Sequence, residues 1–237
     1  MGAIIPAILP TSREDLENKL GRLHGLARAV QIDIVDGRYA SPASWPYTEH
    51  DEVKTSVEFL PYLGQFQFEF DLMVEHSGLV AGGWIDHGVN RITLHAESTR
   101  DLPAVIEKLQ VTYGHDKGFA PDLLSFGLAI GVETDLALIE PYLDRADYVQ
   151  FMGIRTIGRQ GEPFDNRIVR KIVAFRKAHP DTPVQVDGGV NLVTAPVLLD
   201  AGVSRLVIGS GLWKAPDLKE ELRKYQQLAE EHGIYEK

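Results

Sequence analysis

The sequence predicts an α/β fold of the (β/α)8 TIM-barrel class, formed by one domain that spans residues 1–237. Short runs rich in β-branched and aromatic residues recur along the whole chain, and amphipathic stretches with helical spacing separate them. Eight such alternations are typical of parallel β–α–β units that close on themselves. With 44% hydrophobic residues in 237, the chain can bury one large core of this kind.

The expected strands share an apolar run with alternating side-chain character. In chain order they are 3–9 (AIIPAIL), 29–35 (AVQIDIV), 66–74 (FQFEFDLMV), 91–96 (RITLHA), 124–130 (LSFGLAI), 148–154 (YVQFMGI), 183–189 (PVQVDGG) and 205–210 (RLVIGS). The expected helices have apolar residues three and four positions apart, and they cover 13–27, 102–110, 135–143, 164–179, 191–202 and 217–233. The long segment 37–65 follows the second strand, so we expect it to form a rim on the catalytic face.

Composition excludes several classes of protein and of site. The chain has no cysteine, so disulfides, thiolate zinc sites and a cysteine nucleophile are excluded. The formal net charge of −10 repels polyanions, and we expect no nucleic-acid partner. No run of about 18 apolar residues occurs and the first residues lack the basic start of a signal peptide. We therefore expect a cytoplasmic protein with no membrane partner.

Strand alternation places many polar side chains inside the expected barrel. The inward set is Gln31, Asp33, Glu69, Asp71, Met73, Thr93, His95, Gln150, Met152, Gln185 and Asp187. Asp33, Asp71 and Asp187 lie near the strand ends where barrel enzymes carry their chemistry. Two like charges about 4 Å apart repel by about 4 kcal/mol at an effective dielectric near 20, so either a cation binds among them or a carboxylate keeps its proton. The alternative is a hydrogen-bonded polar network without chemistry.

Two glycine turns end the seventh and eighth expected strands. Gly188 and Gly189 belong to VDGGV, and Gly209 and Ser210 belong to IGSG. Glycines let backbone N–H groups approach an oxyanion, and barrels commonly bind phosphate after strands seven and eight. We therefore expect a phosphate-binding site at these turns.

The loop GIRTIGRQGEPF, residues 153–164, carries two further candidate anion-binding residues. Arg155 and Arg159 have the reach to contact a phosphate. They could instead form ion pairs with Glu162 or Asp165 in a solvated loop. The residues alone leave both interpretations open.

Several segments, taken in order, resemble one known family. IIPAIL resembles I-x-P-S-I-L, QIDIVDGRY resembles H-x-D-V-M-D-G-H-F, and FDLMVEHS resembles an H-L-M-V segment. RITLHAES resembles H-x-E-A, FMGIRTIGRQGEPF resembles a distorted M-x-V-x-P-G-F-G-G-Q-x-F, and VDGGV and IGSG match closely. Over nearly its whole length the chain is thus similar to the ribulose-phosphate 3-epimerase family.

This resemblance implies an activity and a set of residues. Family members invert C3 of a ketopentose phosphate through an enediolate, with two aspartates as alternating acid and base and a divalent metal held by two His and those two Asp. Asp33 and Asp187 match the acid/base positions, and Met73 and Met152 match two methionines around the enediolate. The resemblance also implies that a homo-oligomer is possible.

The sequence differs from the family pattern at two positions that would bind the metal. Gln31 and Asp71 stand where the family has its two histidines, so the implied ligands are Asp33, Asp71, Asp187 and Gln31. Such an all-oxygen set favours a hard divalent ion, Mg or Mn or Ca, over zinc or iron. The other possibility is that no metal binds and that one of the three carboxylates titrates near or above neutral pH.

Two functions from different classes remain open. The first is an isomerase or epimerase in carbohydrate metabolism that moves a proton next to the carbonyl of a small phosphorylated ketose. The second is a non-catalytic phosphosugar-binding protein that has lost the metal site. Aldol or decarboxylation chemistry is disfavoured, because the third strand reads DLMVEH and has no D-x-K-x-x-D pattern.

Overall fold

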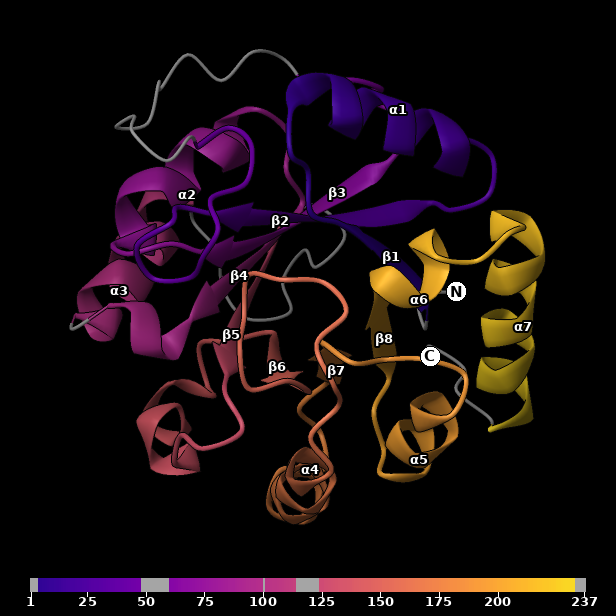
Figure 1. The fold of residues 1–237 in the computed structure, drawn as a ribbon. Coiled ribbons are helices and arrows are strands. Elements are labelled where there is room, and N and C mark those ends of the chain that lie inside the picture. The colour runs from indigo at the N-terminus through magenta and orange to yellow at the C-terminus, as the bar shows by residue number, and fades with distance from the viewer. Residues whose placement is uncertain (1–3, 48–59, 100, 114–123, 233–237) are drawn as a thin grey trace.

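The computed structural model describes residues 4–47, 60–99, 101–113 and 124–232, and it confirms the predicted fold class. Eight parallel strands form a closed barrel in chain order, and the first strand pairs with the last. Figure 1 shows the strands in the centre and the helices arranged around them. Among the described residues, no helix has the length and apolar character needed to cross a bilayer.

Each predicted strand is present, shortened by zero to three residues. The strands are β1 (Ile4–Ile8), β2 (Ala29–Val35), β3 (Gln67–Met73), β4 (Arg91–His95), β5 (Ser125–Ile130), β6 (Tyr148–Met152), β7 (Val184–Asp187) and β8 (Arg205–Ile208). The α-helices are α1 (Arg13–Leu23), α2 (Ser77–Asp86), α3 (Leu102–Tyr113), α4 (Arg167–Ala178), α5 (Thr194–Asp200), α6 (Ser210–Trp213) and α7 (Leu218–Glu231). Short 3-10 helices are η1 (Ala96–Ser98), η2 (Leu136–Leu138) and η3 (Glu140–Tyr142).

Helix boundaries follow local capping. The Ser12 side chain accepts from the Asp15 N–H and begins α1, and the Asp217 side chain accepts from the Glu220 N–H and begins α7. Each cap of this kind stabilises a helix by about 1 kcal/mol. Helix α1 ends at Leu23, earlier than predicted. Gly25 follows with a φ of 75°, a left-handed conformation in which a right-handed helix cannot continue.

The prediction of a helix over 135–143 is wrong, because η2 and η3 occupy that segment. Pro141 lies at the start of η3 and has no N–H to donate, so a continuous α-helix cannot form there. The reverse error concerns α2, which the sequence pattern does not predict. Its segment SGLVAGGWID contains three glycines, each disfavouring a helix by about 1 kcal/mol relative to alanine.

Tertiary packing explains why α2 is rich in glycine. A Cβ atom on Gly78 would lie 2.7 Å from Val105 of α3, and one on Gly82 would lie 3.0 Å from the Tyr113 hydroxyl. The glycines therefore let α2 lie close against α3. That contact supplies the stability which the local sequence lacks.

The main hydrophobic core lies between the barrel wall and the surrounding helices. Outward-facing strand residues such as Ile32, Phe70 and Val186 are fully buried in one cluster with Leu16 of α1 and Phe175 of α4. The alternate residues point into the barrel, and most of them are polar. Apolar burial between the strands and the helices holds the barrel wall in place, and the interior is left for polar side chains.

The first part of the predicted rim, 37–47, is pinned to the end of β2, whereas 48–59 lies outside the described residues. The buried Ser44 hydroxyl donates to the Asp33 carbonyl at 2.8 Å and accepts from the Val35 N–H at 2.8 Å. Trp45 packs against Trp84 of α2, with ring centroids 6.3 Å apart. The rim thus fixes the backbone of the strand that carries Asp33.

The packing inside the barrel also requires a residue without a side chain at position 127. Gly127 of β5 is in register with Tyr148 of β6, and a Cβ on Gly127 would lie 2.1 Å from the Tyr148 ring. That ring is fully buried, its hydroxyl shares a 2.7 Å hydrogen bond with Thr93, and the Arg91 guanidinium lies 3.4 Å from its centroid. Gly127 therefore makes room for the ring.

We predict that Gly127→Ala lowers the free energy of unfolding by about 1–3 kcal/mol, because the buried Tyr148 ring must move. Gly83→Ala is the matched control. A Cβ at Gly83, which is exposed on α2, would meet nothing within 4 Å, so this change should stabilise by about 0.5–1 kcal/mol. Urea denaturation measures both, and equal effects of the two substitutions would contradict this account of the interior.

Candidate active site

Three carboxylates converge at the C-terminal end of the barrel. Asp33 of β2, Asp71 of β3 and Asp187 of β7 each place one oxygen within 4.8 Å of the others. Their exposed fractions are 6%, 0% and 9%. The structure thus brings together the acids that strand alternation pointed inward, at the barrel end where catalysis is usual.

Asp71 is held on both of its oxygens by neighbouring side chains. The His95 Nε2 atom lies 2.9 Å from Asp71 Oδ1, and the Gln150 amide donates to Oδ2 at 2.9 Å. His95 belongs to β4 and Gln150 to β6, and both are fully buried. Asp71 is therefore the most firmly fixed of the three acids.

Gln31 bridges the other two acids. Its Nε2 atom donates to Asp33 Oδ1 at 2.9 Å and to Asp187 Oδ2 at 2.7 Å. A single amide thus spans from β2 to β7, across the strands β1 and β8 that lie between them in the barrel. The two acids that match the acid/base positions are joined by one donor.

Burial and mutual repulsion change how these acids titrate. Burial, followed by the charges of Asp187 and Asp71, raises the pKa of Asp33 well above its usual value. Burial and the charge of Asp71 raise the pKa of Asp187 to about 7. The cluster therefore retains at least one proton near neutral pH, as expected for crowded carboxylates without a cation.

The pKa of His95 is also raised, but the cause differs from that for the acids. Burial disfavours its charged form, but the charge of Asp71 and the hydrogen bond to it outweigh burial, so the pKa of His95 is raised. The Tyr39 hydroxyl lies 3.3 Å from the other ring nitrogen, Nδ1. His95 and its partner Asp71 thus form a buried pair next to the cluster.

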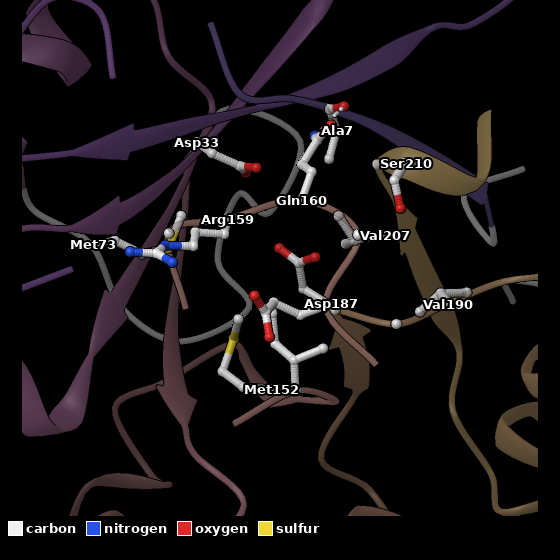
Figure 2. Close-up of a pocket in the computed structure, with 17 residues that line it drawn as sticks. Ala7, Asp33, Met73, Met152, Arg159, Gln160, Asp187, Val190, Val207 and Ser210 are labelled. Atoms are coloured by element: carbon white, nitrogen blue, oxygen red, sulfur yellow. Dashed lines mark hydrogen bonds between the residues drawn. The ribbon is translucent and has the colours of Figure 1, made fainter. Parts of the chain in front are cut away.

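A pocket opens above the carboxylates and is lined by both glycine turns. Figure 2 shows Asp33 and Asp187 pointing into it from different sides, with Met73 and Met152 at its wall. The predicted site residues that line it are Asp33, Met73, Met152, Arg159, Asp187, Gly188, Gly189, Gly209 and Ser210. Gly188 and Gly189 have φ values of 97° and 68°, a left-handed conformation that residues with a Cβ rarely adopt.

The two candidate arginines differ in position. Arg155 is 64% exposed, lies outside the residues that line the pocket, and pairs with Glu133 at 2.7 Å and with Asp165 at 3.5 Å. Of the two interpretations of Arg155, the structure therefore shows the ion pair with Asp165 in the loop. Arg159 does line the pocket, donates to the Ser41 carbonyl at 3.0 Å, and lies across the pocket from Ser210 (Figure 2).

Sequence reasoning missed residues that reach the pocket from loops. The Gln160 side chain lines the pocket next to Gly209, and its amide nitrogen lies 2.6 Å from where a Cβ on Gly209 would be. Glu162 also lines the pocket, and Lys214 lines the adjoining groove together with Ser210. The polarity of the RQGE segment was the one sequence signal for Gln160 and Glu162. Their direction depends on how the loop folds over the barrel.

The donor atoms fit a hard cation only in part. The three carboxylates offer oxygen atoms at a spacing suited to Mg or Mn or Ca. Gln31, the fourth predicted ligand, instead turns its amide nitrogen toward Asp33 and Asp187, and an N–H cannot bind a metal. A cation here would be held by Asp33, Asp71 and Asp187.

Comparison with known proteins shows the family of the chain. A family model described as the ribulose-phosphate 3 epimerase family matches residues 3–213. The chain belongs to this family. The ribulose-phosphate 3-epimerase of Candida glabrata is 30% identical over 241 residues, covering 93% of this chain and 92% of that protein. The enzyme of Bacillus subtilis (strain 168) is 25% identical over 225 residues, covering 92% of this chain and 95% of that protein.

Solved structures resemble this epimerase-family barrel in fold. A structure of KGPDC from Streptococcus mutans matches with a TM-score of 0.71 at 14% identity, covering 98% of this chain and 99% of that chain. The 3-hexulose-6-phosphate synthase from Salmonella typhimurium matches with a TM-score of 0.68 at 14% identity, covering 98% and 100%. At this identity the likeness shows the TIM-barrel architecture alone. The family assignment, by contrast, supports an isomerase of the epimerase type.

The raised pKa values predict how stability depends on pH. The native state binds protons on Asp33 and Asp187 more tightly than the unfolded chain, so stability falls as pH rises from about 4 through about 7. Asp33→Asn removes one of the repelling charges. It should raise the free energy of unfolding at pH 8 by on the order of 2 kcal/mol and change it little at pH 4.

Thermal melts between pH 4 and pH 8, in buffer with chelator, measure this effect. Asp144→Asn is the control, since it removes the same charge from an exposed surface position. A stabilisation by Asp33→Asn that is equal at both pH values would contradict the repulsion between the acids.

Proposed function

We propose that this chain is a ribulose-phosphate 3-epimerase-like enzyme that inverts the carbon next to the carbonyl of a small ketose phosphate. Asp33 and Asp187 act as the two acid/base groups, one removing the proton from carbon and the other returning a proton to the opposite face. The observation that carries this proposal is the pair of buried carboxylates that enter one pocket from β2 and β7. The names of the curated relatives support the substrate class.

The titration of the pair supports the same role. Inversion needs one carboxylate to be ionised while the other carries a proton, and the two must exchange these states in each turnover. The pKa of Asp187 lies at about 7 and that of Asp33 is raised well above its usual value, so near neutral pH the pair retains a proton. Buried carboxylates with normal pKa values would both be ionised, and neither could return the proton.

The phosphate of the substrate would lie against the turns Gly188–Gly189 and Gly209–Ser210, which line the pocket beside Asp187. Arg159 lines the pocket opposite Ser210 (Figure 2) and would contact the far end of the substrate. Met73 and Met152 would supply an apolar, polarisable wall next to the reacting carbons. This arrangement binds a short, open-chain phosphorylated sugar.

A hard divalent cation, when bound by Asp33, Asp71 and Asp187, would supply positive charge for the oxygens of the substrate. Mg and Mn suit the three oxygen ligands better than Zn does. Without a cation, Asp71, which is fully buried between His95 and Gln150, would act through its charge on Asp33 and Asp187.

A non-catalytic phosphosugar-binding protein is the second candidate, because two ligand positions differ from the family pattern. Decarboxylase or aldolase chemistry has less support, since the residue two positions after Asp71 is Met73 rather than a lysine. Among the described residues that line the pocket there is no lysine.

We predict that the protein incorporates solvent deuterium at C3 of D-ribulose 5-phosphate. Asp33→Asn and Asp187→Asn should each lower the exchange rate by about 10²–10⁴-fold, since each removes one group that carries the proton. Proton NMR in heavy water measures the label.

Asp144→Asn serves as the control and should exchange at the wild-type rate. A protein that gains thermal stability with the sugar phosphate but shows no label would be a binder. Exchange that Asp33→Asn leaves unchanged would show that the base is another residue.

We also predict that Mg2+ or Mn2+ stabilises the protein at pH 8. At about one hundred times its dissociation constant, a cation that binds the native state adds about 2.7 kcal/mol, which raises Tm by about 5–10 °C. Asp71→Asn should remove most of that rise, and Asp144→Asn none of it. No rise at any concentration of either ion would favour the interpretation without a metal.

A further inference from the structure

Three glutamines form a chain of side-chain amides inside the barrel, below the carboxylates. Gln185 of β7 donates from Nε2 to the Oε1 atoms of Gln150, at 2.5 Å, and of Gln31, at 3.4 Å. Gln150 and Gln31 in turn donate to the acids above them. All three amides are buried, with exposed fractions of 0–1%.

The lower end of this chain rests on two arginines. Arg91 Nη2 and Arg205 Nε donate to Gln185 Oε1 at 3.4 Å and 3.3 Å. Glu69 fixes both guanidinium groups through an ion pair to each of them. The arginines therefore approach Gln185 from a partly buried base that ion pairs hold together.

The chemistry of the partners fixes the direction of every amide. A guanidinium group only donates, so the atom of Gln185 that faces Arg91 and Arg205 must be oxygen. Its nitrogen then faces Gln150 and Gln31, which must turn their oxygens toward it. Their nitrogens are left pointing at the carboxylates, which accept.

We propose that Gln185 is a positioning residue that holds Gln31 and Gln150 with their N–H groups toward Asp33, Asp187 and Asp71. In this direction Gln31 is a hydrogen-bond donor to the reaction centre and is not a metal ligand. The N–H groups take over part of the charge compensation that a fourth ligand and its metal would otherwise provide. The inference rests on the proposed function only for the roles of Asp33 and Asp187.

Neutron diffraction from a deuterium-exchanged crystal of the wild-type protein tests the direction without any turnover. We expect the two deuterons on Gln31 Nε2 to point at Asp33 and Asp187, and those on Gln185 Nε2 at Gln150 and Gln31. Deuterons on the opposite atom of Gln31 or Gln185 would overturn the proposal. Either result is independent of whether the protein is an epimerase.

Gln185→Glu tests the coupling between the amides. The new carboxylate still accepts from Arg91 and Arg205 but cannot donate, so Gln31 can turn its oxygen toward the acids. Metal affinity depends by about 10–100-fold on such supporting hydrogen bonds. We therefore expect Mn2+ to bind at least about tenfold more tightly in calorimetry, and the side-chain amide signals of Gln31 and Gln150 to shift in ¹H–¹⁵N spectra.

Gln226→Glu is the matched control, because it adds the same charge at an exposed position of α7. It should leave Mn2+ binding and both amide signals unchanged. A Gln185→Glu protein that folds and matches wild type in affinity and in amide signals would overturn the coupling. If that variant does not fold, the neutron result on wild type decides the proposal.

Discussion

The interior of this barrel is polar and buried, and hydrogen bonds and ion pairs between its layers govern the rest of the structure. Glu69 Oε2 and Arg91 Nε have no hydrogen bond and face each other as an ion pair at 3.5 Å. Glu69, Arg91 and Arg205 form the lower layer, three glutamines the middle layer, and the carboxylates the upper layer. An unpaired buried polar group costs about 1–3 kcal/mol, so each layer must match the donors and acceptors of the next. The position of the acids is thus set partly from the far end of the barrel.

The same burial gives the acids their chemical character. In water, three aspartates would ionise almost fully by about pH 5 and would offer no proton near neutral pH. Inside the barrel, desolvation and mutual repulsion raise the pKa of Asp187 to about 7 and keep a proton in the cluster. The barrel wall, packed by its apolar outer core, holds the charges at this spacing despite their repulsion. The repulsion is offset by Gln31, Gln150 and His95, which contact the acids through their nitrogen atoms.

The two positions where the resemblance places histidines are filled by side chains with hydrogen-bond partners. Asp71, which stands where the resemblance places a histidine, is accommodated by His95 and Gln150. Gln31, at the other such position, links the two acid/base candidates as a donor. The substitutions are therefore connected by a hydrogen-bond network, as expected of a site that has been altered and remains ordered.

The sequence by itself determined the barrel, its eight strands and the convergence of Asp33, Asp71 and Asp187, because period-two alternation states which side chains share the inside of a closed sheet. Apolar residues three and four positions apart likewise located α1 and α7. Only the tertiary structure decided the glycine-rich α2, which depends on close approach to α3, and the separate positions of Arg155 and Arg159, which depend on the path of one loop. It also decided which way the Gln31 amide points. That direction follows from Arg91 and Arg205, residues of other strands whose contact with Gln185 no local pattern encodes.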